Sequence, residues 1–146
     1  MRLIARASEE QDIECLDEED RGVVSLLHPR IAELICERGW RQLTPVQRIA
    51  IPRIIAGDNV LAMAPTGHGK TEAAMLPILS QMVSMDRGAM DKGIYVLYIT
   101  PLKALINDLT VRIEWWASRL GFTVGRKLVM CPRSRGLGGI ERFQRY

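Results

Sequence analysis

The stretch that most constrains this chain is Ala-Pro-Thr-Gly-His-Gly-Lys-Thr, residues 64–71. It follows a short apolar run at residues 59–63 and opens a segment with helical spacing. A strand, a glycine-containing loop and a Lys-Thr pair at the start of a helix form a cradle whose backbone N–H groups face phosphate oxygens. In such a cradle Lys70 reaches the β- and γ-phosphates, and the Thr71 hydroxyl holds Mg²⁺. The stretch therefore predicts a phosphate-binding loop.

The match to the general pattern G-x-x-x-x-G-K-[ST] is incomplete, because Ala64 stands in the place of its first glycine. The alternative is a glycine-rich turn before an ordinary helix. With glycine at about 7% of residues, Gly-x-Gly-Lys-Ser/Thr arises by chance in roughly one such chain in a few hundred. We therefore assign the whole loop to the phosphate site: Ala64, Pro65, Thr66, Gly67, His68, Gly69, Lys70 and Thr71.

Strand-like and helix-like patterns alternate along the chain. Strands are expected at residues 59–63, 94–99 and 122–124, where apolar and β-favouring residues gather. Helices are expected from Pro29 to before Gly39, from Thr44 to before Gly57, from Lys70 to about Val83, and from Pro101 to about Ser118. This alternation predicts an α/β fold, with a parallel sheet of about three strands flanked by helices.

The helix that begins at Thr44-Pro45 has one apolar face in the sequence pattern. The residues of that face are Val46, Ile49, Ala50 and Ile54. Gln47 lies outside the face and is expected to be exposed, and Pro52 is expected to kink the helix or to end it early.

Charge is concentrated at the two ends of the chain. Residues 1–25 hold three arginines against eight carboxylates, and residues 126–146 hold six Lys or Arg against one Glu. We expect an acidic N-terminal arm over residues 1–25, in which the run Asp17-Glu18-Glu19-Asp20 is solvated. Residues 131–146 are expected to be a basic tail of undefined structure, which either touches nucleic acid or is simply solvated.

The three cysteines, Cys15, Cys36 and Cys131, are odd in number and form no C-x-x-C pair. This pattern fits neither a zinc site nor a disulfide framework, so reduced thiols in a cytoplasmic protein are expected. The N-terminal residues lack the apolar core of a signal peptide, and no apolar run approaches the roughly 18 residues that a membrane helix needs. A soluble, intracellular protein without a membrane partner is expected.

Three stretches, taken together, resemble the first RecA-like domain of DEAD/DEAH-box (superfamily 2) helicases. They are Gly39-Trp40 with Leu43-Thr44-Pro45-Val46-Gln47 and Ala50-Ile51-Pro52, then residues 64–72, and then Thr100-Pro101-Leu102-Lys103-Ala104-Leu105. The wording of residues 71–74 and 101–108 looks most like the large helicase-related (Lhr) branch. The resemblance implies a partial RecA-like ATP-binding domain over residues 26–130, with a Q motif, motif I and motif Ia.

The resemblance also implies residue roles. Gln47 matches the glutamine that reads the adenine edge of ATP, and Trp40 matches an aromatic residue near the base, although a buried core tryptophan is equally compatible with the sequence. The loop would hold ATP and Mg²⁺, with Thr71 as the metal ligand. The motif Ia residues, Thr100, Pro101, Leu102, Lys103 and Ala104, would grip the sugar–phosphate backbone of single-stranded DNA or RNA, or would merely start a helix.

The chain also departs from the family pattern. No D-E-x-H or D-E-x-D pair follows motif Ia, and Cys131-Pro132-Arg133 stands where the family continues into a His-Gly-Asp type turn. Phosphoryl transfer needs an acidic Mg²⁺ ligand and a residue that orients water. We therefore expect an ATP-binding, N-terminal helicase fragment, from a truncated or frameshifted reading frame, without ATPase activity of its own.

Two other readings remain open from the sequence. One is a non-catalytic module that binds nucleotide or nucleic acid, or a truncated remnant. The other is a small nucleotide kinase, which would leave the Q-motif and motif Ia matches unexplained. Oligomeric state and the choice between DNA and RNA are not specified.

Overall fold

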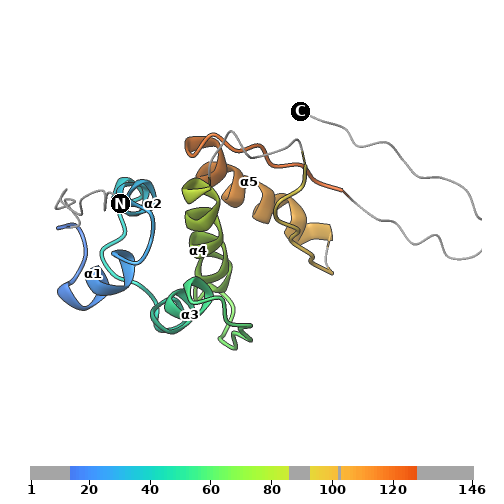
Figure 1. Cartoon of the computed structure of the whole chain (residues 1–146). Coiled ribbons are helices and arrows are strands. Elements are labelled where there is room, and N and C mark those ends of the chain that lie inside the picture. The colour runs from blue at the N-terminus through green and yellow to red at the C-terminus, as the bar shows by residue number, and fades with distance from the viewer. Residues whose placement is uncertain (1–13, 86–92, 102, 128–146) are drawn as a thin grey trace, which may run out of the picture. The chain divides into compact units, whose positions relative to one another are not determined.

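The computed structural model describes residues 14–85, 93–101 and 103–127 (Figure 1). These residues contain five α-helices: α1 (Glu18–Val24), α2 (Pro29–Glu37), α3 (Pro45–Ile55), α4 (Lys70–Ser84) and α5 (Lys103–Arg119). The chain divides into two compact units, Met1–Ile94 and Tyr95–Tyr146. The first unit holds α1 to α4, and the second holds α5.

The predicted parallel sheet is absent from the described residues, which contain no strand, so the α/β prediction and its RecA-like sheet are wrong there. Residues 59–63 and 94–99 have no regular structure, and several of their side chains are exposed, with Leu61 at 87% and Ile99 at 81%. A strand forms only against a partner, whereas the sequence reports only its propensity and expected burial. Among the described residues of the first unit, residues 59–63 are the one segment with a strand pattern along its whole length, so these residues offer no second strand to pair with it.

Helix α2 forms as its sequence signals predict. His28 is its N-cap, with Nδ1 accepting a hydrogen bond from the Arg30 N–H at 3.2 Å, and Pro29 follows at the first helical position. The helix ends at Glu37, and Gly39 then takes a positive φ of 77°. The buried side chains of α2 are Ile31, Ala32, Leu34 and Ile35. The expected amphipathic helix is therefore confirmed.

Helices α3 and α4 pack against each other and form much of the core of the first unit. Helix α3 begins at Pro45 and continues through Pro52 to Ile55, so Pro52 does not end it early. Its buried residues are Gln47, Ala50 and Ile51, whereas Ile49 is 72% exposed. The apolar face predicted from the sequence is therefore out of phase with the face that is buried. From α4, Leu76 and Leu79 are buried in this core.

The acidic run before α2 is part of this fold. It contributes the short helix α1, in which Val24 and Asp20 are fully buried, while Glu18 and Glu19 are exposed. The expectation of a solvated run is wrong for Asp20, because the helical spacing of Asp20 and Val24 places both on the buried face of α1.

A disulfide joins Cys15 to Cys36, with their Cα atoms 5.7 Å apart. It links the segment before α1 to α2, and Asp17 N–H donates to the Arg41 carbonyl at 3.1 Å in the same region. The expectation of reduced thiols is wrong for this pair. Cys131 and the predicted basic tail lie outside the described residues.

In the second unit, α5 begins at Lys103, two residues after the predicted start. Near its C-terminal end, Trp115 and Trp116 meet edge-to-face with ring centroids 4.8 Å apart, and the Arg119 guanidinium lies 4.0 Å from the Trp115 ring centre. Phe122 N–H then donates to the Ala117 carbonyl at 2.9 Å. The predicted strand at residues 122–124 has no regular structure.

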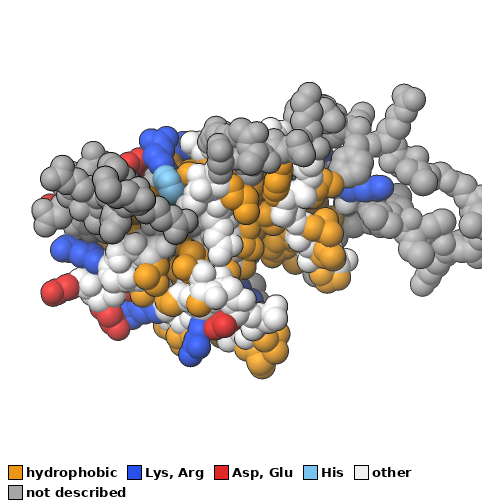
Figure 2. All heavy atoms as spheres, in the orientation of Figure 1, with side chains coloured by type: hydrophobic (Ala, Val, Ile, Leu, Met, Phe, Trp, Pro, Cys, Tyr) orange, Lys and Arg blue, Asp and Glu red, His pale blue; other side chains and the backbone are white. Residues whose placement is uncertain are grey.

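Large hydrophobic side chains reach the surface in the face shown in Figure 2. Among the described residues, three large hydrophobic side chains are more than four-fifths exposed, and all three belong to segments predicted as strands: Leu61, Met63 and Ile99. Among the residues that the structure describes, no helix has both the length and the apolar composition for crossing a membrane.

Candidate nucleotide-binding site

The loop at residues 64–69 turns directly into α4. Gly67 and Gly69 have positive φ values of 84° and 75°, and Gly69 is the N-cap of α4. His68 N–H donates to the Pro65 carbonyl at 3.4 Å, and His68 Nδ1 lies 3.2 Å from the Thr66 carbonyl oxygen. Because the first N–H groups of a helix have no partner within that helix, the turn of α4 after this loop can receive an anion.

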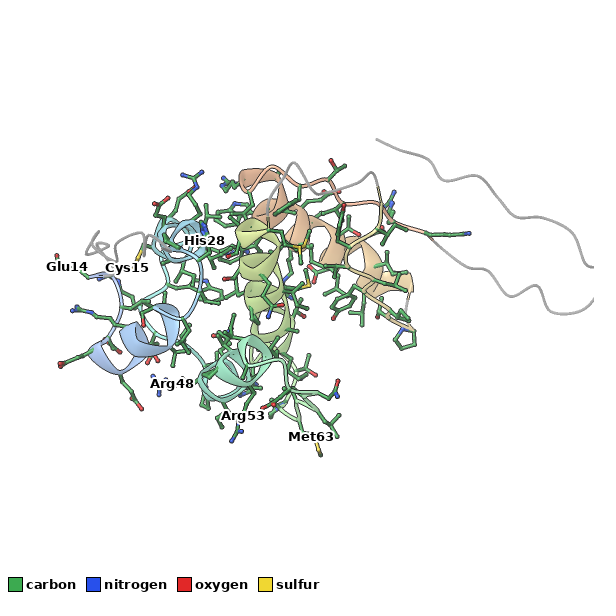
Figure 3. All side chains as sticks on the ribbon, viewed as in Figure 1. Glu14, Cys15, His28, Arg48, Arg53 and Met63 are labelled. Atoms are coloured by element: carbon green, nitrogen blue, oxygen red, sulfur yellow. A yellow bond between two sulfur atoms is a disulfide. The ribbon has the colours of Figure 1, made fainter. Side chains whose placement is uncertain are left out.

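The Lys70 side chain folds back over the loop. Its ammonium donates hydrogen bonds to the carbonyl oxygens of Ala64 and Pro65, the latter at 2.8 Å. The positive charge therefore lies inside the turn that the sequence assigns to phosphate. Thr71, the next residue of α4, is half-buried. Met63, the last residue of the apolar segment before the loop, is 86% exposed and points outward in Figure 3.

Gln47 joins α3 to the loop. Its Oε1 accepts from the Thr44 N–H at 2.9 Å, and its Nε2 donates to the Gly69 carbonyl at 3.3 Å. The side chain is only 2% exposed, so the expectation of an exposed glutamine is wrong. The acceptor that explains its burial is 22 residues further along the chain.

Gly69 is in close contact with the first turn of α3. A Cβ atom at Gly69 would lie 2.4 Å from Gln47 Nε2 and 3.3 Å from Thr44 Oγ1, which is buried and makes no hydrogen bond of its own. By contrast, a Cβ at Gly67 would meet no atom within 4 Å. Both glycines take a backbone conformation that other residues rarely adopt, but only Gly69 is also required by packing.

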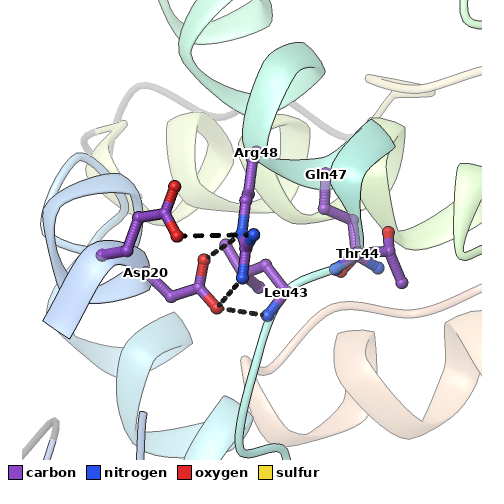
Figure 4. A network of polar contacts seen from close by, with 6 residues as sticks. Asp20, Leu43, Thr44, Gln47 and Arg48 are labelled. Atoms are coloured by element: carbon purple, nitrogen blue, oxygen red, sulfur yellow. Dashed lines mark hydrogen bonds and ion pairs between the residues drawn. The ribbon is translucent and has the colours of Figure 1, made fainter. Parts of the chain in front are cut away.

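A second polar cluster holds the other side of the α3 N-terminus (Figure 4). Asp20 Oδ2 accepts from the Leu43 N–H at 2.6 Å and from Arg48 Nη2 at 3.1 Å, while Oδ1 accepts from Arg48 Nε at 2.6 Å. Glu19 adds an exposed ion pair to Arg48 at 3.5 Å. Burial would raise the pKa of Asp20, but the hydrogen bonds from Arg48 and Leu43 and the Arg48 charge hold it below its ordinary value of 3.8.

Asp20 should make the free energy of unfolding depend on pH, with a loss of stability in acid. Its pKa is lower in the folded chain, so its contribution is complete above pH 3.8 and is lost as the pH falls through the folded pKa. Urea unfolding between about pH 7 and about pH 3 should therefore show a steeper acid loss for the wild-type chain than for Asp20→Asn. Equal acid slopes in the two proteins would contradict this assignment.

The remaining predicted residues are only partly described. Trp40 is half-buried, and its backbone N–H donates to the Ile35 carbonyl at 3.3 Å, just beyond α2. Thr100 is half-buried and Pro101 is exposed; Leu102 and the side chains of Lys103 and Ala104 lie outside the described part. The motif Ia residues belong to the second unit, and the loop belongs to the first.

Asp20 is the residue of this region whose role the sequence did not reveal. Its i, i+4 spacing from Val24 was the available signal. In the described part of the chain, no three His, Cys, Asp or Glu side chains gather as metal ligands.

Comparison with known proteins gives a consistent picture. The DEAD/DEAH box helicase family model matches residues 44–135. The ATP-dependent helicase Lhr-Core of Sulfolobus acidocaldarius is 43% identical over 95 residues, covering 64% of this chain and 11% of that protein. The ATP-dependent helicase Lhr-Core of Methanothermobacter thermautotrophicus is 43% identical over 91 residues, covering 62% of this chain and 10% of that protein.

A more distant relative is the pre-mRNA-splicing ATP-dependent RNA helicase prp-28 of Neurospora crassa. It is 32% identical over 103 residues, covering 68% of this chain and 14% of that protein. The chain thus spans between 10% and 14% of the length of these three relatives. No solved structure matches the chain.

Proposed function

The chain belongs to the DEAD/DEAH box helicase family, and from this premise we propose that residues 44–71 bind ATP for an ATP-dependent helicase of the Lhr type. The observation that carries the proposal is the contact between Gln47 and Gly69. This contact joins Gln47, which we propose reads the base, to Gly69, the last residue of the loop that we propose holds the phosphates.

The Gln47 amide has spare hydrogen-bonding capacity. A carboxamide oxygen can accept two hydrogen bonds and its NH₂ group can donate two, and the structure uses one of each, to Thr44 and Gly69. Adenine offers one donor, its exocyclic amine, next to one acceptor, N7. The unused donor and acceptor of the Gln47 amide match this pair, and because the side chain is only 2% exposed, it would have to become accessible to the base when the nucleotide binds.

The phosphates would be held by the loop and by the start of α4. In the present structure Lys70 donates to neutral carbonyls, and an ionised phosphate oxygen is a stronger acceptor for its ammonium. The positive φ values of Gly67 and Gly69 shape the turn beneath the phosphates. For Mg²⁺, Thr71 would supply one hydroxyl ligand and the nucleotide would supply phosphate oxygens.

The nucleic-acid contact is proposed for residues 100–104. Helix α5 begins at Lys103, two residues after Pro101. The N–H groups of its first turn suit the phosphates of a single strand without regard to base sequence. The motif Ia resemblance supports this proposal.

Replacement of Lys70 by alanine tests the ATP site. Loss of a charged hydrogen bond costs about 1.5–3 kcal/mol, so Lys70→Ala should weaken ATP–Mg²⁺ binding about ten- to hundredfold. Titration calorimetry would measure this affinity, and the rise in melting temperature with ATP–Mg²⁺ should shrink in parallel. Lys127→Ala, an exposed lysine of the second unit, is the control for the loss of one positive charge. Equal affinity in Lys70→Ala and the wild-type chain would contradict the proposal.

A further inference from the structure

Asp20 lies outside every motif of the proposed site, but it bonds to both ends of the segment that contains Gln47. Its side chain is fully buried. One of its oxygens accepts from the N–H of Leu43, immediately before the N-cap of α3, and both of its oxygens accept from Arg48.

We propose that Asp20 is a positioning residue for adenine recognition, which fixes the first turn of α3 and thereby the carboxamide of Gln47. The inference rests on the proposed function, since it assumes that Gln47 reads the base.

The geometry supports an action through Gln47. Leu43 and Arg48 are the two partners of Asp20, and Gln47 and its own partner Thr44 lie between them in the chain. Loss of the Asp20 contacts frees both ends of this short segment. The Gln47 amide must then find the adenine edge from a backbone that is no longer fixed, and small displacements of positioning groups are costly in recognition.

The same geometry predicts what Asp20 leaves unchanged. Its bonds to Leu43 and Arg48 reach α3 and the residue before its N-cap, whereas Lys70 is held by carbonyls of the loop itself. Asp20 reaches the loop only indirectly, through the Gln47–Gly69 contact, so binding of the phosphates alone should depend on Asp20 much less than binding of ATP. This separates positioning from general stabilisation, because partial unfolding would weaken the binding of every ligand alike.

The test compares three probes with Mg²⁺, namely ATP, GTP and inorganic tripolyphosphate, on the full chain. Asp20→Asn should weaken ATP binding about tenfold, the value of roughly one or two lost hydrogen bonds, and should reduce the preference for ATP over GTP. Tripolyphosphate affinity should fall by much less, by no more than about twofold, because the loop keeps its own contacts to Lys70. Glu18→Gln, which removes an exposed charge from the same turn of α1, should match the wild-type chain with all three probes.

Each other result has a defined meaning. Unchanged ATP affinity in Asp20→Asn, or a parallel loss with ATP and tripolyphosphate, would overturn the positioning role. A wild-type chain that binds ATP no better than GTP would overturn adenine reading by Gln47, and the inference with it.

If circular dichroism shows that Asp20→Asn is unfolded, Arg48→Lys provides a second test of the positioning role. Arg48→Lys keeps the positive charge beside Asp20 but cannot reproduce the paired guanidinium contacts. It should show the same selective loss of ATP affinity, and wild-type selectivity in this variant would refute the proposal.

Discussion

Replacement of Ile51 by alanine is expected to lower the free energy of unfolding by about 2–5 kcal/mol. Ile51 is completely buried on α3, in the helix pair that it forms with α4. Truncation removes apolar contacts and leaves a cavity that the surrounding side chains fill only in part. Urea unfolding of the full chain, at constant slope against denaturant, measures the change.

Ile49→Ala is the matched control, because it makes the same chemical change two residues earlier on the same helix. Ile49 is 72% exposed, so its truncation should change stability by no more than about 0.5 kcal/mol. Similar losses in the two variants would show that the buried face of α3 is assigned incorrectly.

Gly69→Ala is expected to destabilise the chain by about 2–4 kcal/mol even without nucleotide. The positive φ of 75° costs a non-glycine residue about 1–2 kcal/mol. The added Cβ, 2.4 Å from Gln47 Nε2, would also displace the carboxamide from its acceptor. Thermal unfolding of the nucleotide-free chain measures the combined effect.

Gly67→Ala separates the two contributions. Its φ of 84° carries the same backbone cost, but its Cβ would meet no atom within 4 Å. The two variants should therefore differ by about 1–2 kcal/mol, the value of the displaced Gln47 contact. Gly57→Ala, which lies outside the loop and has a φ of 87° and an open Cβ position, provides the same comparison away from the site. Equal stabilities for the Gly67 and Gly69 variants would argue against the contact with Gln47.

The helix starts were predictable from the sequence because their causes are local. Pro29 and Thr44-Pro45 mark helix N-termini by their own backbone preferences, and Lys70 begins α4 where the loop pattern places it. The family resemblance was likewise carried by short motifs, and the family match confirms it.

The predictions that were wrong concern residues whose partners are distant in the chain. A polar residue is predicted to be exposed unless its hydrogen-bond partner is known. For Gln47 that partner is the Gly69 carbonyl, 22 residues further along the chain. The same holds for Asp20, which reads as one of four solvated acids until Leu43 and Arg48 lie beside it. Strand patterns at residues 59–63 and 94–99 report a preference for pairing, which the described residues do not satisfy.

One contact limits how far this site can be moved to another protein. The His28 N–H donates to Ser80 Oγ at 2.6 Å, across 52 residues, so the start of α2 is fastened to α4 beyond the loop. The Asp20 contacts and the His28–Ser80 hydrogen bond therefore involve residues that come before and after residues 44–71 in the chain. A graft of residues 44–71 alone would carry Gln47 and the loop but neither of these contacts. A portable unit would therefore have to include both Asp20 and Ser80, with the helices α1 and α4 to which they belong.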